Sequence, residues 1–399
     1  MTRRVFKGGL VFDGTGADPY AADVAVEHGR FTAVGRDLRG EEITDVRGRI
    51  LLPGLFDTHV HVLGVEPELP VRLAEPFSYQ FYAAIRNLRS LLECGITTIR
   101  DCAGADLGVK RAVETGLVRG PRMRISITAI SQTAGHMDGW TPSGEYVNPY
   151  YLPHPGRPGS IADGPEAVRK LVRQTIRAGA DFVKVLCTDG LTTDPRRTHF
   201  GEAELAVLMA EARAAGLPVA AHAIGAEGVK NAVRAGARSI EHGAYLDEEA
   251  VALMAGHGTW LVPTLFTEPG DMPAVLEAER DLGADLYKAA EFGHAHVASF
   301  RAALAAGVRI AMGTDYGNDC GANLVQLVVM HEAGMPAEKV LVSATSAAAE
   351  LMGLAGELGT IAPGKRADLV ILDGDPYDFR AFKDNIRAVY QDGVLRVES

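Results

Sequence analysis

The strongest constraint on the fold is an alternation of short apolar runs with amphipathic stretches between residues 52 and 353. Stretches such as 202–215 and 225–235 have helical spacing, and many end in a Gly-containing turn such as RAGAR. This alternation is typical of parallel sheets covered by helices. The expected strands are 52–62, 97–101, 122–129, 182–186, 218–222, 239–242, 260–265 and 309–315. Eight strands over about 300 residues predict an α/β fold, a (β/α)8 TIM-like barrel.

Both ends of the chain follow a different pattern. Residues 4–51 contain short apolar runs broken by Gly and Asp, as in tight hairpins. The C-terminal segments GTIAPGKRADLVILDGD and IRAVYQDGVLRV repeat this style. Because the N-terminal strands are too few for a stable sheet of their own, we expect the two ends to combine. The predicted domains are a small β-sandwich of residues 1–54 plus 355–399, and a barrel of residues 55–354.

The composition excludes several classes of function. A formal net charge of −11 and the lack of a Lys/Arg cluster argue against a nucleic-acid partner. No run approaches the ~18 apolar residues of a membrane span, and no apolar segment of a secretory signal follows MTRRVFKGG. The four cysteines show no CxxC spacing, which favours a reducing compartment. We expect a soluble cytoplasmic protein that binds a small-molecule substrate; the sequence leaves homo-oligomer formation open.

Ionisable side chains recur at the ends of the predicted strands. His59 and His61 are two residues apart on the first strand, so both imidazoles point to one face. An HxH pair alone often arises by chance. The C-terminal strand ends, however, are where barrel enzymes place catalytic groups. The set at these ends is His59, His61, Lys184, His222, His242 and Asp315, and its four histidines and one carboxylate suit Zn-type coordination.

Lys184 is the most informative member of this set. It interrupts the apolar segment FVKVL, so its amine is expected to point into the barrel. Burial of an isolated ammonium is costly and commonly lowers the pKa of the amine. A neutral buried amine can react with carbon dioxide to give a carbamate, whose two oxygens can bridge two cations. The alternative is an ordinary lysine paired with a buried carboxylate.

The motifs FDTHVH, FVKVL, AAHA, SIEHG and MGTD resemble the strand-end motifs of the metal-dependent amidohydrolase superfamily. The likeness extends over nearly the whole chain and is nearest to the branch of imidazolonepropionase-like proteins and Xaa-Pro dipeptidases (prolidases). It implies two divalent metal ions, with Zn2+ expected. One ion would take His59, His61 and Asp315 and the other His222 and His242, with N6-carboxylated Lys184 and a hydroxide bridging both.

The resemblance also implies a reaction. The hydroxide would attack an amide carbonyl, and Asp315 would accept its proton and pass it to the leaving nitrogen. His136, in QTAGHMDGW, matches a histidine that relatives use to polarise the carbonyl oxygen. It lies in a long connection, 131–164, that follows the third strand and is therefore expected over the barrel mouth. The alternative for His136 is a loop histidine in solvent.

The substrate is less well defined by the sequence. Ile224 stands where dipeptidase relatives often have a Tyr, and Cys-Thr-Asp-Gly follows Lys184 where they often have Gly-Gly. Both departures weaken a transfer of prolidase specificity. Arg196 and Arg197 are candidates for binding a substrate carboxylate, or are simply solvated. The further candidate contacts are Tyr146, Tyr150, Tyr151 and Tyr316.

Three functions remain open at this stage. The first is a binuclear metal-dependent hydrolase that cleaves an amide bond of a dipeptide such as Xaa-Pro or of an N-acyl amino acid. The second is a mononuclear deaminase or cyclic-amide (imidazolonepropionase-like) hydrolase. The third is a catalytically inactive relative with a structural or interaction role.

Several ionisable residues are expected to lie outside the site. Glu241 precedes His242 and, by strand alternation, is expected to point away from the site. Surface positions are expected for the histidines that do not lie at the end of a predicted strand, which are His154, His199, His294 and His296.

Overall fold

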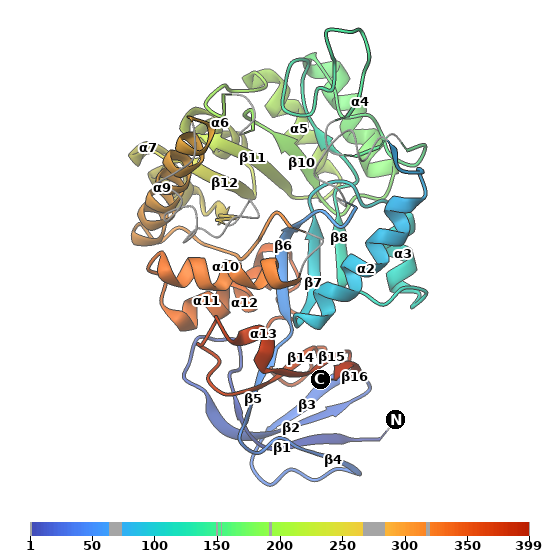
Figure 1. Ribbon diagram of the computed structural model, residues 1–399, viewed down its shortest axis with the longest axis vertical. Coiled ribbons are helices and arrows are strands. Elements are labelled where there is room, and N and C mark those ends of the chain that lie inside the picture. The colour runs from blue at the N-terminus through green and yellow to red at the C-terminus, as the bar shows by residue number, and fades with distance from the viewer. Residues whose placement is uncertain are drawn as a thin grey trace.

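A computed structural model describes residues 2–63, 74–148, 151–152, 154–190, 194–265, 284–316 and 320–398. Figure 1 shows a helix-covered barrel with a small β domain at one end, where both termini lie. The predicted fold class, a barrel with a β-sandwich domain made from both chain ends, is confirmed. The predicted boundaries of the two domains stay a prediction.

The small domain joins the two ends of the chain in one connected sheet. Its order is β16-β15-β14-β5-β1-β2-β3, with β4 paired to β1. The decisive pairing is antiparallel, between β5 and β14, from Leu369 opposite Pro53 to Asp373 opposite Arg49. A core that includes Phe6, Phe31 and Leu51 lies within this domain. Its strands are β1 Arg4–Val11, β2 Tyr20–Glu27, β3 Arg30–Gly35, β4 Glu42–Asp45, β5 Arg49–Pro53, β14 Leu369–Asp373, β15 Ile386–Gln391 and β16 Val394–Glu398.

The barrel strands form two parallel sheets, ordered β6-β7-β8 and β13-β12-β11-β10-β9. The strand predicted at 122–129 is interrupted after β8, because Ile127 has a φ of 68°. The strands are β6 Leu55–Val60, β7 Ile96–Asp101, β8 Arg122–Ile125, β9 Ala129–Ile130, β10 Val183–Leu186, β11 Val219–Gly225, β12 Ser239–Tyr245 and β13 Trp260–Val262.

The segment 309–316 closes the barrel between β13 and β6. It lacks a continuous strand, which differs from the prediction for 309–315, and has isolated bridges at Ile310 and Tyr316. Hydrogen bonds nevertheless run to both sides. Leu261 N donates to Arg309 O over 2.8 Å, and Thr58 N donates to Met312 O over 2.9 Å. The segment therefore holds Asp315 beside the end of β6.

The helices pack around these strands (Figure 1). The glycine cap predicted in RAGAR is present, because Gly236, with a φ of 106°, ends α6. Gly258, with a φ of 67°, ends α7 in the same way. Among the described residues, no helix is both long and apolar enough to cross a membrane. The helices are α2 Tyr79–Glu93, α3 Leu107–Glu114, α4 Gly164–Arg177, α5 Glu202–Ala214, α6 Ala226–Ala235, α7 Glu248–His257, α9 Ala284–Ala305, α10 Cys320–Glu332, α11 Ala337–Ser343, α12 Ser346–Leu351 and α13 Phe382–Asn385.

Gly54, between β5 and β6, tests how tightly the β domain is joined to the barrel. A Cβ there would lie 2.2 Å from Thr97 Oγ1 and 3.0 Å from Asp368 Cβ. We expect Gly54→Ala to lower the free energy of unfolding by about 1–3 kcal/mol through overpacking, measured by urea denaturation. Gly35→Ala is the control, because a Cβ at Gly35 would have no neighbour within 4 Å. Equal stability of the two variants would contradict this packing.

Candidate metal centre

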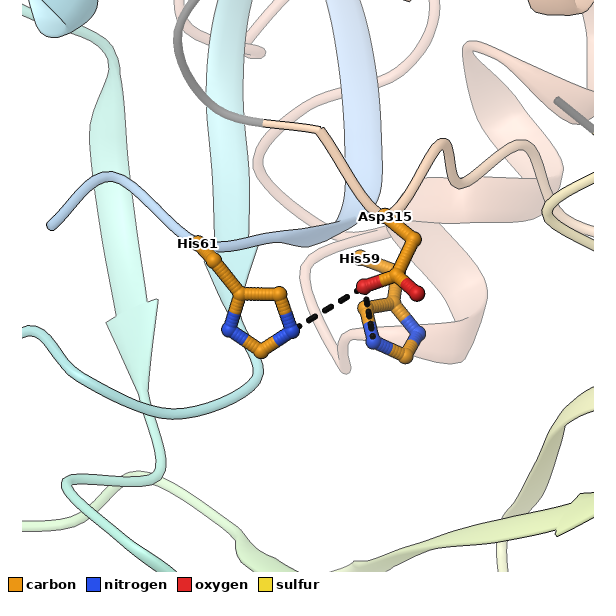
Figure 2. A group of neighbouring side chains, drawn as sticks. All are labelled: His59, His61 and Asp315. Atoms are coloured by element: carbon orange, nitrogen blue, oxygen red, sulfur yellow. Dashed lines mark ion pairs between the residues drawn. The ribbon is translucent and has the colours of Figure 1, made fainter. Parts of the chain in front are cut away.

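The end of β6 brings two predicted ligands against a third. Asp315 Oδ1 lies 3.3 Å from His59 Nε2 and 3.0 Å from His61 Nε2 (Figure 2). The ligand atoms of these three residues lie within 4.8 Å of one another, close enough to share one metal ion. The backbone fixes this approach, because Asp315 N donates to His59 O over 2.8 Å.

The backbone is strained where the site is built. The φ angle is 65° at Asp315, 72° at His242 and 43° at Thr264, a region that residues other than Gly and Asn rarely adopt. Such strain persists only where surrounding contacts hold it in place. Asp57 supplies contacts of that kind, since its carboxylate accepts from Thr314 Oγ1 and Asn323 Nδ2, each over 2.7 Å. These contacts therefore hold the positive-φ residues around the site in one conformation.

His222 and His242 form the other side of the cluster, within β11 and β12. Their ring centroids are 4.6 Å apart, and the ring of His242 lies 5.1 Å from that of His59. Burial lowers the pKa of both imidazoles well below the usual value, and the nearby Lys184 lowers it further. Both rings are therefore neutral at neutral pH, which is the form that binds a metal.

The hydrogen bonds of the rings show which nitrogens remain for a ligand. A ring nitrogen that bonds to a carbonyl must donate, so its partner nitrogen carries the lone pair. His61 Nδ1 donates to Ala103 O over 2.8 Å, and His222 Nε2 donates to Asp189 O over 3.2 Å. The lone pairs are then on His61 Nε2 and His222 Nδ1. The donor set fits metal binding.

Lys184 extends from β10 into the same space. It is 2% exposed, and its Nζ lies 3.3 Å from His59 Nε2. The alternative of an ordinary lysine paired with a carboxylate finds no support in the described ranges, where Lys184 forms no ion pair. Its amine therefore contacts the histidine cluster directly, while the carboxylates of Asp315 and Glu241 reach the other sides of the same His59 ring.

Electrostatics around the first three ligands favour a cation. Burial alone would raise the pKa of Asp315, but the adjacent His59 and His61 hold it well below its usual range, so the carboxylate is ionised. Burial likewise would lower the pKa of His59, yet the neighbouring Cys102 and Asp315 raise it. The same negative surroundings that stabilise a proton on His59 stabilise a metal cation in its place.

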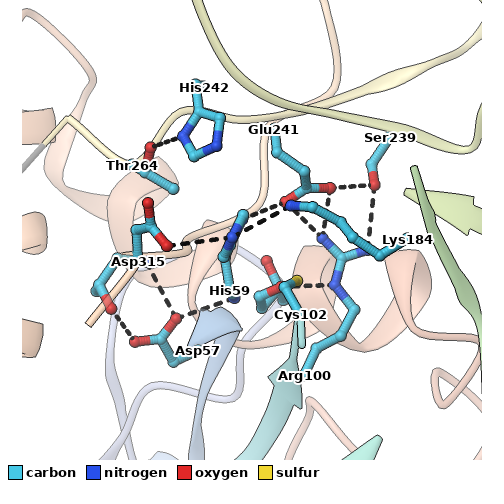
Figure 3. A network of polar contacts seen from close by, with 12 residues as sticks. Asp57, His59, Arg100, Cys102, Lys184, Ser239, Glu241, His242, Thr264 and Asp315 are labelled. Atoms are coloured by element: carbon cyan, nitrogen blue, oxygen red, sulfur yellow. Dashed lines mark hydrogen bonds and ion pairs between the residues drawn. The ribbon is translucent and has the colours of Figure 1, made fainter. Parts of the chain in front are cut away.

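Glu241 lies inside the barrel, so the expectation that it points away from the site is wrong. It is fully buried, and its Oε2 is 2.7 Å from His59 Nδ1 (Figure 3). Ser239 and Glu241 share the inward face by strand alternation. The positive φ of His242 breaks that alternation, which turns His242 to the same side.

His136 reaches the site from the connection after β9. Its ring stacks on that of His222 with centroids 4.9 Å apart and planes at 19°. A Cβ at Gly190 would lie 1.9 Å from His136 Cε1, so this glycine leaves room for the imidazole. Burial lowers the pKa of His136 to about 4, which keeps the ring neutral at neutral pH.

The sequence profile described as the amidohydrolase family matches residues 50–396. This chain belongs to the amidohydrolase family.

Individual relatives agree with that assignment. Ochratoxinase from Aspergillus niger is 31% identical, over an alignment covering 95% of this chain and 83% of that protein. Imidazolonepropionase from Acidiphilium cryptum (strain JF-5) is 28% identical, with 89% and 88% covered. A solved prolidase complexed with N-methylphosphonate-L-proline has a TM-score of 0.87 and 34% identity, with both chains fully covered. This amidohydrolase is therefore a hydrolase of carbon–nitrogen bonds in small molecules, from a family that generally depends on metal.

The predicted substrate contacts lie in different environments. Ile224 is buried against Ala244 and Phe292. The Tyr151 hydroxyl is occupied, with Thr128 Oγ1 at 2.8 Å and Ser160 Oγ at 2.9 Å.

The two loop arginines also differ. Arg196 is exposed and places its guanidinium 5.1 Å from the centre of the Tyr245 ring. Arg197 instead pairs with Asp189 over 2.8 Å.

The tyrosine candidates stay predictions as substrate contacts. Tyr146 is exposed, Tyr316 is half-buried beside β6, and Tyr150 lies outside the described residues.

Two of the histidines assigned to the surface are buried in this amidohydrolase, so that expectation is wrong for them. His199 Nε2 lies 2.7 Å from Asp189 Oδ1, and His296 Nε2 donates to His242 O over 3.0 Å. His154 is half-buried against Phe77, whereas His294 is exposed as expected. Partners from distant segments bury these side chains, and no local pattern in the sequence marks them.

His296 gives the stability of the enzyme a testable pH dependence. Burial lowers its pKa to about 4, whereas in the unfolded chain it titrates near ~6.5. As the pH falls from about 6.5 to about 4, the unfolded state binds the proton first, so His296 makes the native state lose stability. We expect His296→Gln to remove up to roughly 3 kcal/mol of that loss, measured by urea denaturation across the window. The control is His257→Gln on the exposed end of α7; a similar change in both variants would contradict the assignment.

Proposed function

We propose that this amidohydrolase is a binuclear metal-dependent enzyme that hydrolyses the amide bond of a dipeptide such as Xaa-Pro or of an N-acyl amino acid. The observation that carries the proposal is the position of Lys184. Its buried amine lies 3.3 Å from His59 Nε2, facing a cluster of metal-binding side chains. A lysine there is best explained as the precursor of a bridging anion.

The proposed metal sites divide the cluster in two. His59, His61 and Asp315 would hold one divalent cation, expected to be Zn2+, and His222 with His242 would hold the other. The nitrogen lone pair of the Lys184 amine, in its unprotonated form, would attack carbon dioxide, form an N–C bond and release a proton to solvent. The resulting carbamate on Nζ would contribute one oxygen to each cation.

Each remaining side chain has a separate role in the proposed reaction. The bound cations would supply a hydroxide nucleophile at neutral pH and polarise the scissile carbonyl. Asp315, ionised in its buried position, would accept the proton of the nucleophile and deliver it to the leaving nitrogen. His136, neutral at neutral pH, would donate a hydrogen bond to the carbonyl oxygen as negative charge develops on it.

The substrate class rests on relatives and on the mouth of the barrel. The prolidase of similar structure was solved with N-methylphosphonate-L-proline, a ligand that carries a carboxylate. Here the exposed guanidinium of Arg196 would be free to meet such a carboxylate, while Ile224 would offer only apolar contact. Arg196 and Tyr151 therefore remain candidates for substrate binding, and Ile224 for specificity.

Lys184→Ala tests the proposal most simply. We expect wild-type protein to contain about two zinc ions per chain and the variant fewer, because the bridging anion is lost. The variant should also lose activity on Xaa-Pro and N-acyl amino acid libraries by roughly 1,000-fold or more. Lys170→Ala, on the exposed face of α4, is the control for metal content by mass spectrometry.

Other results would redirect the proposal. About one metal per chain would favour the mononuclear deaminase or cyclic-amide hydrolase, a reading supported by the imidazolonepropionase relative. Wild-type activity that survives complete chelation, or full activity of Lys184→Ala, would refute the binuclear mechanism.

His136→Ala tests the role of the stacked imidazole. Because the hydrogen bond from His136 strengthens as charge develops, we expect kcat to fall by roughly 100- to 1,000-fold with a smaller change in KM. Metal content should stay at the wild-type value. The exposed His294 gives the control variant His294→Ala, with both parameters unchanged. A rise in KM with an unchanged kcat would instead assign His136 to substrate binding.

A further inference from the structure

Beneath the metal centre lies a buried pair, Arg100 and Glu241, that the proposed reaction does not use. Arg100 extends from β7 and Glu241 from β12, and both are nearly inaccessible to solvent. One guanidinium nitrogen, Nη2, lies 2.7 Å from Glu241 Oε1 and 2.8 Å from Oε2. Figure 3 shows this pair beside His59, with Glu241 joined to the imidazole.

Both oxygens of Glu241 are occupied by donors. Oε2 accepts from His59 Nδ1 over 2.7 Å, and Oε1 accepts from Ser239 Oγ over 2.5 Å, in addition to Arg100. A carboxylate can serve all of these donors at once, whereas an amide of the same shape has only one acceptor oxygen. The site therefore requires the ionised form of this side chain.

Arg100 also holds the backbone beside His59. Its Nε donates to Thr58 O over 2.5 Å, and Nη1 lies 3.1 Å from Ser239 Oγ. Arg100 thus fixes His59 twice, through the carbonyl of the preceding residue and through the carboxylate that holds the ring. A buried ion pair needed only for folding would not require this connection, since apolar residues of similar volume often serve as well.

We infer that Glu241, held by Arg100, is a positioning residue for the metal centre. It fixes the proton of His59 on Nδ1, so the lone pair on Nε2 faces Asp315 and Lys184. The negative charge of Glu241 also makes the imidazole a stronger ligand. This inference rests on the proposed function for the identity of the ligand.

Glu241→Gln tests the inference without a change of shape. Its NH2 group would face Arg100 Nη2 in either orientation, and His59 Nδ1 as well in one of them, so a donor is set against a donor. We expect the affinity of the apoprotein for Zn2+ to fall about 10- to 100-fold, measured by competition with a chromophoric chelator. The visible absorption spectrum of the Co2+-loaded protein should change as well, a readout that a merely structural role would not move.

The matched control is Asp368→Asn. It disturbs another ion pair, in which the half-buried Arg122 places Nη1 2.9 Å from Oδ2 of the buried Asp368, at the joint with the β domain. This variant should keep wild-type Zn2+ affinity and the wild-type Co2+ spectrum. If Glu241→Gln does not fold, Arg100→Lys provides the same test, because it keeps the charge but loses the guanidinium contacts to Thr58 and Glu241.

The outcomes separate this inference from the proposed function. A wild-type protein that binds no metal overturns the proposed function itself. A wild-type protein that binds metal, with an unchanged affinity and Co2+ spectrum in folded Glu241→Gln, overturns only the positioning role. Equal loss of affinity in Glu241→Gln and Asp368→Asn would also overturn it, as a general effect of losing a buried ion pair.

Discussion

Burial of charge inside the barrel is the constraint on which the rest of the site depends. Taking an ion out of water costs several kcal/mol in a folded protein unless a partner replaces the lost hydration. Arg100 and Glu241 meet this requirement with each other. Lys184, equally buried, forms no ion pair in the described part of the chain, and its nearest polar partner is an imidazole. A buried amine held against imidazoles in this way is well suited to a modification and a ligand that complete the site.

The same constraint explains the unusual backbone at the mouth. Asp315 and His242 both have positive φ angles, which turn their side chains toward one point instead of alternating faces. The segment 309–316 gives up a regular strand, yet keeps hydrogen bonds to Leu261 and Thr58 on its two sides. Local strain is tolerated because Asp57 and the neighbouring strands fix the chain around it. These departures from regular strand geometry bring the candidate metal ligands together at one point.

Much of this arrangement can be predicted from the sequence, because the C-terminal ends of all barrel strands lie at the same face of the barrel. The period of two places His59 and His61 together, and the short motif around each later strand end locates Lys184, His222 and Asp315. A prediction that assumes side chains alternate between the two faces of a strand fails where the backbone interrupts that alternation. The prediction for Glu241 is wrong because it assumed regular alternation, whereas the positive φ at His242 breaks the alternation there.

A second kind of residue escapes prediction for a different reason. His199 and His296 are buried by Asp189 and by the backbone of His242, contacts between segments that are separated along the chain. Packing partners of this kind depend on the tertiary structure and leave no periodic trace. The tyrosine and arginine candidates around the mouth share this problem, since a loop side chain is placed by whatever it packs against.

In the proposed enzyme, Lys184 would carry an anion that joins two cations. The most direct test is a crystal structure of the zinc-loaded protein grown with bicarbonate, with anomalous diffraction measured on both sides of the zinc absorption edge. We expect two zinc peaks, one beside His61 and one beside His222, with electron density continuing from Lys184 Nζ to both. A bare amine at Lys184, or a single zinc peak, would contradict it.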